Sequence, residues 1–132
     1  MNKPKYLYHG STQKLSIIQP HQAAGLPEEN GNLNGVYAYE SFDMARRFAM
    51  PIEKVDGRLS VIFEEETGRI ILNKGIVHKT DVGYVHKVLS DTFEKIDQWQ
   101  WFSRASVAVE EVIEVRTADI WNYIDFKGNH NE

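Results

Sequence analysis

The chain has 132 residues, no cysteine and a net charge of −4, with 42% hydrophobic and 26% charged side chains, which fits one globular domain. These values exclude disulfides, thiolate metal sites and cysteine nucleophiles, and the negative charge argues against nonspecific binding to nucleic acids, whose affinity comes from neutralised phosphates. No apolar run approaches the roughly 18 residues of a membrane span, and the N-terminus lacks the apolar stretch of a secretory signal, so we expect a cytoplasmic protein without a membrane partner.

The N-terminal part of the chain predicts one strand and then a long connection. Residues 6–9 are apolar and aromatic and predict a strand that Gly10 ends. Residues 10–35 are rich in Gly, Asn, Pro and Gln, and connections of that length are often functional. Within this connection, residues 15–18 form a short apolar stretch able to pair, and residues 21–34 are a candidate lid or a variable surface.

A second strand and a clear helix follow. Residues 36–39 predict a strand, and Ser41 predicts the N-cap of a helix of about three turns. An apolar stripe on this helix leaves Arg46 and Arg47 facing away from the core. Pro51 prevents the helix from continuing. The stripe consists of Phe42, Ala45, Phe48 and Ala49.

The second half of the chain predicts mainly strands. Residues 59–63 and 69–72 flank the turn residues 66–68 and predict a hairpin with a solvated, glutamate-rich tip. Residues 91–97 predict a helical turn. The alternation over 107–115 predicts a strand with Val107, Val109, Ile113 and Val115 on one face. Further strands are predicted over 83–90 and 99–102, and Thr117 or Asp119 is expected to cap a final short helix.

These elements predict a single α+β domain over residues 1–126. It would contain about six or seven short strands, with two or three short helices inserted between them. Strands mostly neighbour strands instead of alternating with long helices, which favours α+β over a doubly wound parallel sheet. The tail over residues 127–132 has no apolar side chain to bury and is expected to fray.

Several kinds of site are not indicated by the sequence. The five histidines are scattered without an i, i+4 pair, so we expect no metal. No glycine-rich phosphate loop occurs, and no Gly-x-Ser-x-Gly nucleophile turn. The aromatic stretch over residues 99–102 is expected to pack in the core and along a strand. It has too few basic neighbours for a platform that stacks on nucleic-acid bases.

Two short motifs remain, Tyr-His-Gly-Ser over residues 8–11 and Val-Tyr-Ala-Tyr over residues 36–39. In the structural interpretation, Tyr8 packs in the core and the His9 imidazole bonds a backbone carbonyl. In the functional interpretation, a flat polar ligand lies against the bare backbone of Gly10, where no side chain intervenes. The sequence alone leaves both interpretations open.

The order and spacing of these motifs, with Ala45 and Ala49 in the next helix, resemble the opening of the ADP-ribosyltransferase superfamily. The chain is most similar to the small bacterial rifamycin-modifying type and more distantly to the catalytic domain of poly-ADP-ribose polymerases. The similarity covers residues 6–50 and, more thinly, residues 84–115. It implies the split antiparallel sheets of the ADP-ribosyltransferase-like fold, and NAD as the substrate.

The resemblance also implies a role for each residue of the two motifs. His9 would hold a ribose hydroxyl of NAD, and Tyr37 would stack on the nicotinamide ring. Gly10 would offer its backbone N–H and C=O to the nicotinamide carboxamide, which needs one donor and one acceptor in a plane. Ser11 and Tyr39 would line the same site.

Charged groups complete the implied site. Arg46 would reach the pyrophosphate, with a solvated helix charge as the alternative. An acid would stabilise the positive charge that develops as nicotinamide leaves. Asp97 is the first candidate for this acid and Glu94 the second, and Gln98 or Gln100 may instead occupy the family position. With a glutamine there, the site would bind a nucleotide without turning it over.

The resemblance therefore predicts transfer of ADP-ribose from NAD to an acceptor that is a protein, a nucleic acid or a small molecule. Two alternatives stay open. One is a nucleotide-binding or interaction module on the same fold that does not catalyse. The other is an enzyme that uses NAD to remove a 2′-phosphate from RNA, and that branch carries several arginines in its pocket.

Overall fold

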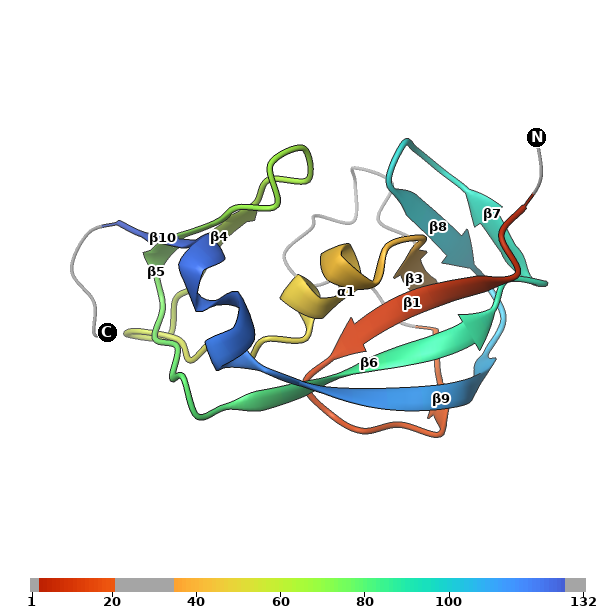
Figure 1. Cartoon of the computed structure of the whole chain (residues 1–132), viewed down its shortest axis with the longest axis horizontal. Helices are drawn as coiled ribbons and strands as arrows, with labels where there is room; N and C mark the ends of the chain where they lie inside the picture. The colour runs from red at the N-terminus through yellow and green to blue at the C-terminus, as the bar shows by residue number, and fades with distance from the viewer. Residues whose placement is uncertain (1–2, 21–34, 128–132) are drawn as a thin grey trace.

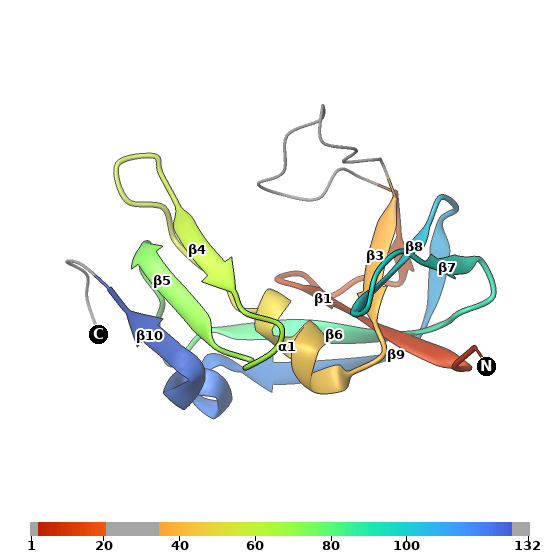
Figure 2. The ribbon, with the colours of Figure 1, turned by 90° about the horizontal axis from the view of Figure 1, so that it is seen from above.

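The structure is a computed structural model, and it describes residues 3–20 and 35–127. The strands lie in two sheets, and helix α1 lies between the smaller sheet and strands β3 and β8 (Figures 1 and 2). The helices are α1 (Phe42–Phe48) and the 3-10 helix η2 (Thr117–Tyr123). The strands are β1 (Tyr6–Ser11), β2 (Ile17–Ile18), β3 (Val36–Tyr39), β4 (Ser60–Phe63), β5 (Ile70–Lys74), β6 (Val82–Leu89), β7 (Phe93–Lys95), β8 (Gln100–Ser103), β9 (Val107–Arg116) and β10 (Ile124–Phe126).

The larger sheet has the strand order β2-β9-β6-β1-β3-β8-β7, and all its neighbouring strands are antiparallel. The smaller sheet has the order β10-β5-β4, in which β10 and β5 are parallel. A single domain that is mostly sheet, with two helices, confirms the α+β class. The stretch over residues 15–18 does pair, as β2 with β9. The described residues also form β7 and β10, which are only three residues long, too short for a sequence pattern.

The side chains of the larger sheet pack on two faces. One face, here called the β2 face, is covered by the segment that contains Leu15 and β2. The opposite face, here called the α1 face, is covered by helix α1. The β2-face cluster consists of Leu7, Ile18, Val36, Ala38, Val88, Phe93, Trp101 and Val107. The α1-face cluster consists of Tyr39, Met44, Ala45, Ala49, Val85 and Val115.

Helix α1 begins where the sequence predicts, because the Ser41 hydroxyl accepts a backbone N–H of the first turn at 3.2 Å. It spans only Phe42–Phe48, about two turns instead of three. The expectation that Arg47 faces away from the core is wrong, since its side chain is buried over the Tyr123 ring and against Gly68. A helical pattern could not show this, because the covering groups come from the smaller sheet and η2.

Two other local expectations are wrong because strand pairing overrides them. Gly10 does not end β1, which continues to Ser11 in register with β6. The expected helical turn over residues 91–97 is instead the edge strand β7 and the turn that follows it. The packing role expected for the aromatic stretch is confirmed, since Trp101 and Phe102 are both buried.

The C-terminal elements differ from the prediction at their boundaries. Helix η2 follows Arg116 and has no side-chain cap, so neither Thr117 nor Asp119 caps it. It leads into β10, a strand that the sequence pattern did not predict. The Lys127 N–H then donates to the Leu72 carbonyl at 2.9 Å, so the first tail residue is bonded to β5, and the rest of the tail lies outside the described residues.

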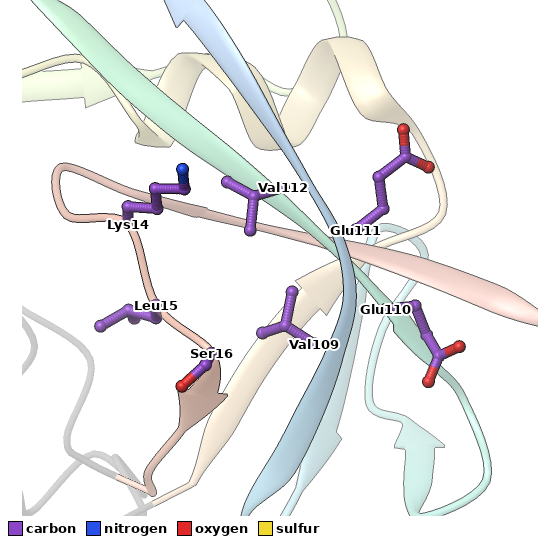
Figure 3. A pocket seen from close by; sticks show the side chains of 7 residues that line it. All are labelled: Lys14, Leu15, Ser16, Val109, Glu110, Glu111 and Val112. Atoms are coloured by element: carbon purple, nitrogen blue, oxygen red, sulfur yellow. The ribbon is translucent and has the colours of Figure 1, made fainter.

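Strand β9 contains a β-bulge that reverses its apolar faces. Its pairing with β6 skips Glu110. Val109, before the bulge, packs against the β2-face cluster, and Val115, after it, packs in the α1-face cluster. The expectation of one apolar face is wrong because one extra residue inverts the alternation. Figure 3 shows Val109 and Val112 on one side of β9 and Glu110 and Glu111 on the other.

Candidate functional site

His9 lies in β1, directly opposite His86 of β6. Its side chain is buried, and its Nδ1 lies 2.7 Å from the Tyr37 carbonyl oxygen. Because a carbonyl only accepts, Nδ1 carries the proton and donates. This bond confirms the structural interpretation of His9 and fixes the tautomer of its ring.

His86 joins β1 to the segment that covers the β2 face. Its ring is completely buried, and the Leu15 N–H donates to its Nε2 at 2.9 Å. Its Nδ1 lies 3.2 Å from the His9 carbonyl and donates to it. With one nitrogen accepting and the other donating, the imidazole is neutral, and burial lowers the His86 pKa below its usual value of 6.5.

The backbone of Gly10 faces an edge of β1 that β3 leaves open. The Ser90 N–H donates to the Lys5 carbonyl at 3.0 Å, so the odd-numbered residues of β1 direct their backbone groups at β6. Backbone groups alternate along an antiparallel strand, so Gly10 directs its N–H and C=O toward β3. Among the described residues, β1 and β3 pair only at Tyr8 and Tyr39.

His9 explains why this pairing stops. Continued antiparallel register would set Gly10 against Tyr37, whose carbonyl would accept the Gly10 N–H. That carbonyl accepts from the His9 imidazole instead. The edge of β1 at Gly10 therefore lies beyond the Tyr8–Tyr39 pair, outside the ladder with β3 in the described residues, and is here called the open edge.

The absence of a side chain at Gly10 has a separate, structural cause. A Cβ atom there would overlap the Ala45 carbonyl oxygen and lie 2.9 Å from the Ala49 nitrogen. A Cβ at Gly83 of β6 would likewise overlap the Ala49 carbonyl oxygen. Both glycines thus let α1 approach the sheet closely. The glycine of the motif is required by packing, and its side-chain position is not where a ligand would lie.

A pocket of about 360 Å³ lies on the β2 face beside the open edge, within the usual size range of ligand pockets. Its described lining offers an imidazole, a hydroxyl and a side-chain amide but no carboxylate. On its own it can hold a polar ligand, but it offers no negative charge for a developing cation. The lining residues are His9, Gly10, Ser11, Leu15, Ile17, Ile18, Gln19 and Pro20.

The phenol rings of β3 lie on the other face of the sheet. Val36 and Ala38 pack in the β2-face cluster, so the alternate residues Tyr37 and Tyr39 face α1. The Tyr37 ring packs against Phe102, with 5.0 Å between ring centroids. The expected meeting of imidazole and phenol in one cleft is therefore wrong, because the His9 imidazole lies on the β2 face and the Tyr37 ring on the α1 face.

Tyr39 lies at the centre of a polar cluster on the α1 face. Its hydroxyl accepts the Gln100 side-chain N–H at 3.0 Å, and the carboxyl groups of Glu65 and Asp97 lie near it. Burial raises the pKa of the Tyr39 hydroxyl well above its usual value, so the phenol is protonated. Burial, with the charge of Asp97, also raises the pKa of Glu65 above its usual range.

Asp97 and Glu94, the two carboxylates that the sequence favours for the acid, lie in positions that suit this role poorly. One oxygen of Asp97 accepts the backbone N–H groups of Trp99 and Gln100, at 2.8 and 2.7 Å, and so shapes the turn before β8. Glu94 is exposed on the edge strand β7, opposite Phe102. Glu94 shares a face with Phe102 and Tyr37, but its strand is the outermost of the sheet.

The arginines of α1 differ in their surroundings. Arg46 pairs with Asp43 at 3.4 Å, and its side chain is 19% exposed. Arg47 donates to the Asp43 carbonyl at 2.7 Å. The Nε atoms of both arginines are buried without a hydrogen-bond partner in the described part of the chain. The role of Arg46 at a pyrophosphate stays a prediction.

Sequence reasoning missed three residues that the structure brings to this region, namely Phe48, Glu65 and His86. Phe48 has a partly exposed ring between Tyr39 and Phe63, with centroids 5.1 and 4.4 Å away. Glu65 was assigned with its neighbours to a solvated tip. Glu65 lies two residues after Phe63, the spacing that places two side chains on the same face of a strand, and this spacing could have indicated its position.

Comparison with protein-family models, with curated proteins and with solved structures finds no match. Within residues 3–20 and 35–127, no group of three or more His, Asp or Glu side chains is arranged to hold a metal ion. No helix in the same residues is long and apolar enough to cross a membrane. The functional argument therefore depends on the geometry of this site and on the resemblance of its two motifs.

Proposed function

We propose that the protein binds NAD at the open edge of β1 and transfers its ADP-ribose to an acceptor, on an ADP-ribosyltransferase-like fold. The observation that carries the proposal is the interrupted pairing of β1 and β3. The Gly10 N–H and C=O, one donor and one acceptor in a plane, are directed at the part of β3 that does not pair with β1 in the described residues, and a carboxamide requires such a pair of groups.

The surroundings of the open edge support this choice of ligand. The partly exposed Phe48 ring, which packs between Tyr39 and Phe63, belongs to the helix turn that packs directly on Gly10, and an aromatic cluster of this kind suits a neighbouring nicotinamide ring. The carboxyl groups near Tyr39 supply the negative charge that cleavage of a glycosidic bond needs.

Two measurements test the proposal. Calorimetric titration with NAD should give saturable binding to the wild-type protein, and chromatography should then detect nicotinamide release, with water or an added acceptor taking the ADP-ribose. His9→Gln should weaken NAD binding by at least about tenfold. The matched control His78→Gln alters a half-exposed histidine next to Glu53 and should leave binding unchanged. Absence of any binding to NAD would contradict the proposal.

One observation favours the non-catalytic alternative. The group bonded to the Tyr39 hydroxyl from β8 is the neutral amide of Gln100 and not a carboxylate. A protein that NAD stabilises against heat, but that releases no nicotinamide with any class of acceptor, would be a nucleotide-binding module on the same fold.

A further inference from the structure

We propose that the outer edge of β4, here called the β4 edge, binds an extended segment of another protein, which adds a strand to the smaller sheet. The proposal goes beyond NAD binding, because it depends on β4 and its neighbours and not on the open edge of β1. It follows from the direction of the β4 backbone groups, from the exposed apolar residues of this strand and from the acidic turn at its end.

β4 is the least protected of the strands that end the two sheets in the described residues. The larger sheet ends in β2 and β7, and the smaller sheet ends in β10 and β4. β2 has two residues, β7 contains Glu94 and Lys95, and β10 contains Asp125. Short length and charge both hinder the addition of a further strand. β4 has four residues and none of them is charged, so its edge can accept another strand.

The backbone groups of Val61 and Phe63 are directed away from the smaller sheet. The Leu72 carbonyl accepts the Lys127 N–H, so the Leu72 backbone is directed at β10. Its cross-strand partner Val61 is then directed away from β5, and Phe63 follows by alternation. No residue in the described part of the chain pairs with this edge. An extended chain pairs with such a row of N–H and C=O groups when it adds to a sheet.

Apolar side chains of this strand and of the residue before it are exposed to solvent. Ile62 is 52% exposed, and Leu59, which precedes β4, is 42% exposed. Val61 and Phe63 pack against the buried cluster of the smaller sheet, so Ile62 lies on the opposite face. A strand added at the β4 edge would place an apolar side chain beside Ile62 and cover it. Exposed apolar side chains beside an unpaired strand edge favour a protein partner.

The turn after β4 favours a basic partner. Glu64, Glu65 and Glu66 follow the strand, and Glu64 and Glu66 are exposed. Within the described residues, no ion pair joins these glutamates to a lysine, arginine or histidine. A lysine or arginine at the corresponding end of the added strand would complement their charge. The partner is thus an extended segment with alternating apolar residues and a basic end.

A single extended segment fits this position, whereas a second copy of the chain does not. In both views β4 lies between β5 and the strands β3 and β8 of the larger sheet (Figures 1 and 2). The Phe63 ring contacts the Phe48 ring, with 4.4 Å between centroids, and this contact holds β4 beside α1. A partner that brought a whole sheet to the β4 edge would meet β3 and β8, but one added strand occupies only about 5 Å.

A synthetic peptide tests the proposal. The probe is a capped heptapeptide of two lysines followed by alternating valine and threonine, because the amino end of an antiparallel strand would lie beside the acidic turn. Titration into ¹⁵N-labelled protein should saturate with a Kd of about 1 mM or tighter. At saturation the Val61 and Phe63 amides should exchange more slowly with solvent. The Ile62 amide, which is directed at β5, should exchange slowly with and without the peptide.

Two matched pairs sharpen the test. Ile62→Lys should weaken binding by at least about tenfold, because it removes the apolar contact and adds a charge that repels the lysines. Ile96→Lys alters a side chain that is 50% exposed after β7 and should leave binding unchanged. A peptide with glutamates in place of the lysines should bind at least about fivefold more weakly. Thermal melting establishes that both variants are folded.

Each result decides for or against the proposal. Absence of saturable binding by the lysine peptide, or binding that leaves the Val61 and Phe63 amides unaffected, would overturn it. Equal binding of the glutamate peptide would overturn the basic character of the partner. A wild-type dimer in sedimentation that Ile62→Lys abolishes would mean that a second copy occupies the β4 edge instead. NAD takes part in none of these measurements, so they leave the proposed function to its own test.

Discussion

The two edges of β1 show how one strand behaves with and without a complete neighbour. Toward β6, every residue from Tyr6 to Ser11 has a cross-strand partner, whereas toward β3 the pairing in the described residues is confined to Tyr8 and Tyr39. The ladder with β6 therefore holds β1 along its whole length, whereas Gly10 faces a part of β3 that lies outside the ladder in the described residues. A preorganised backbone of this kind binds a planar ligand without first paying for its own ordering.

The largest effect is expected from substitutions that fill the space between α1 and the paired strands β1 and β6. Gly83→Ala and Gly10→Ala would each drive a methyl group into the helix backbone and should lower the free energy of unfolding by about 3 kcal/mol or more. Gly57→Ala is the control, because nothing lies near its Cβ position; its positive φ should cost only about 1 kcal/mol. Urea denaturation measures all three, and equal losses would show that α1 does not require these glycines.

The next largest effect is expected at the open edge. His9→Ala removes the imidazole that donates to the Tyr37 carbonyl, and the loss of one such hydrogen bond costs about 0.5–1.5 kcal/mol. Thermal melting should therefore show a loss of stability together with the weaker binding of NAD. A His9→Ala protein with wild-type stability would mean that the imidazole does not separate the two strands.

His86, which lies on the paired edge opposite His9, should make the free energy of unfolding sensitive to acid. Its pKa in the folded protein is lowered by burial, so as the pH falls below about 6.5 the unfolded chain takes up the proton first. The free energy of unfolding then falls by about 1.4 kcal/mol for each unit by which the His86 pKa in the folded protein lies below its value in the unfolded chain. His86→Gln keeps an acceptor for the Leu15 N–H but does not titrate, and it should flatten this dependence. Parallel loss in both proteins would contradict the neutral His86 ring.

The smallest effect is expected at the start of α1. Ser41→Ala removes the hydroxyl that accepts the first-turn N–H and should cost about 1 kcal/mol. Because α1 packs on both glycines of the sheet, NAD binding should weaken in proportion to the loss of helix. Circular dichroism and calorimetric titration on the same samples measure the two quantities, and weaker binding at full stability would point to a direct role for Ser41.

The sequence predicted the elements whose signals are local. Ser41 marks the start of α1, and the glycine-containing turn between β4 and β5 marks the hairpin, because capping and turn residues act within a few positions. The faces of β9 could not be predicted, since the bulge at Glu110 is set by its register with β6. β7 was missed for the same reason, because its pairing with β8 decides its conformation.

The candidate site was predicted in part. The proximity of the two motifs follows from their being neighbouring strands, and the bond from His9 to a backbone carbonyl was one of the two interpretations. The opposite faces of His9 and Tyr37 follow from strand alternation once the pairing is known. The spacing from Phe63 indicates only the side of the hairpin on which Glu65 lies, and its proximity to Tyr39 could not be predicted because the two residues belong to different sheets.

Amide hydrogen exchange of ¹⁵N-labelled protein tests the open edge most directly. In the free protein the Gly10 amide should exchange much faster than those of Leu7 and His9, which bond to β6. Saturating NAD, or nicotinamide alone, should slow the exchange of the Gly10 amide and leave the exchange rates of the Leu7 and His9 amides unchanged. A Gly10 amide that is protected without ligand, or that saturating NAD leaves unaffected, would contradict the account.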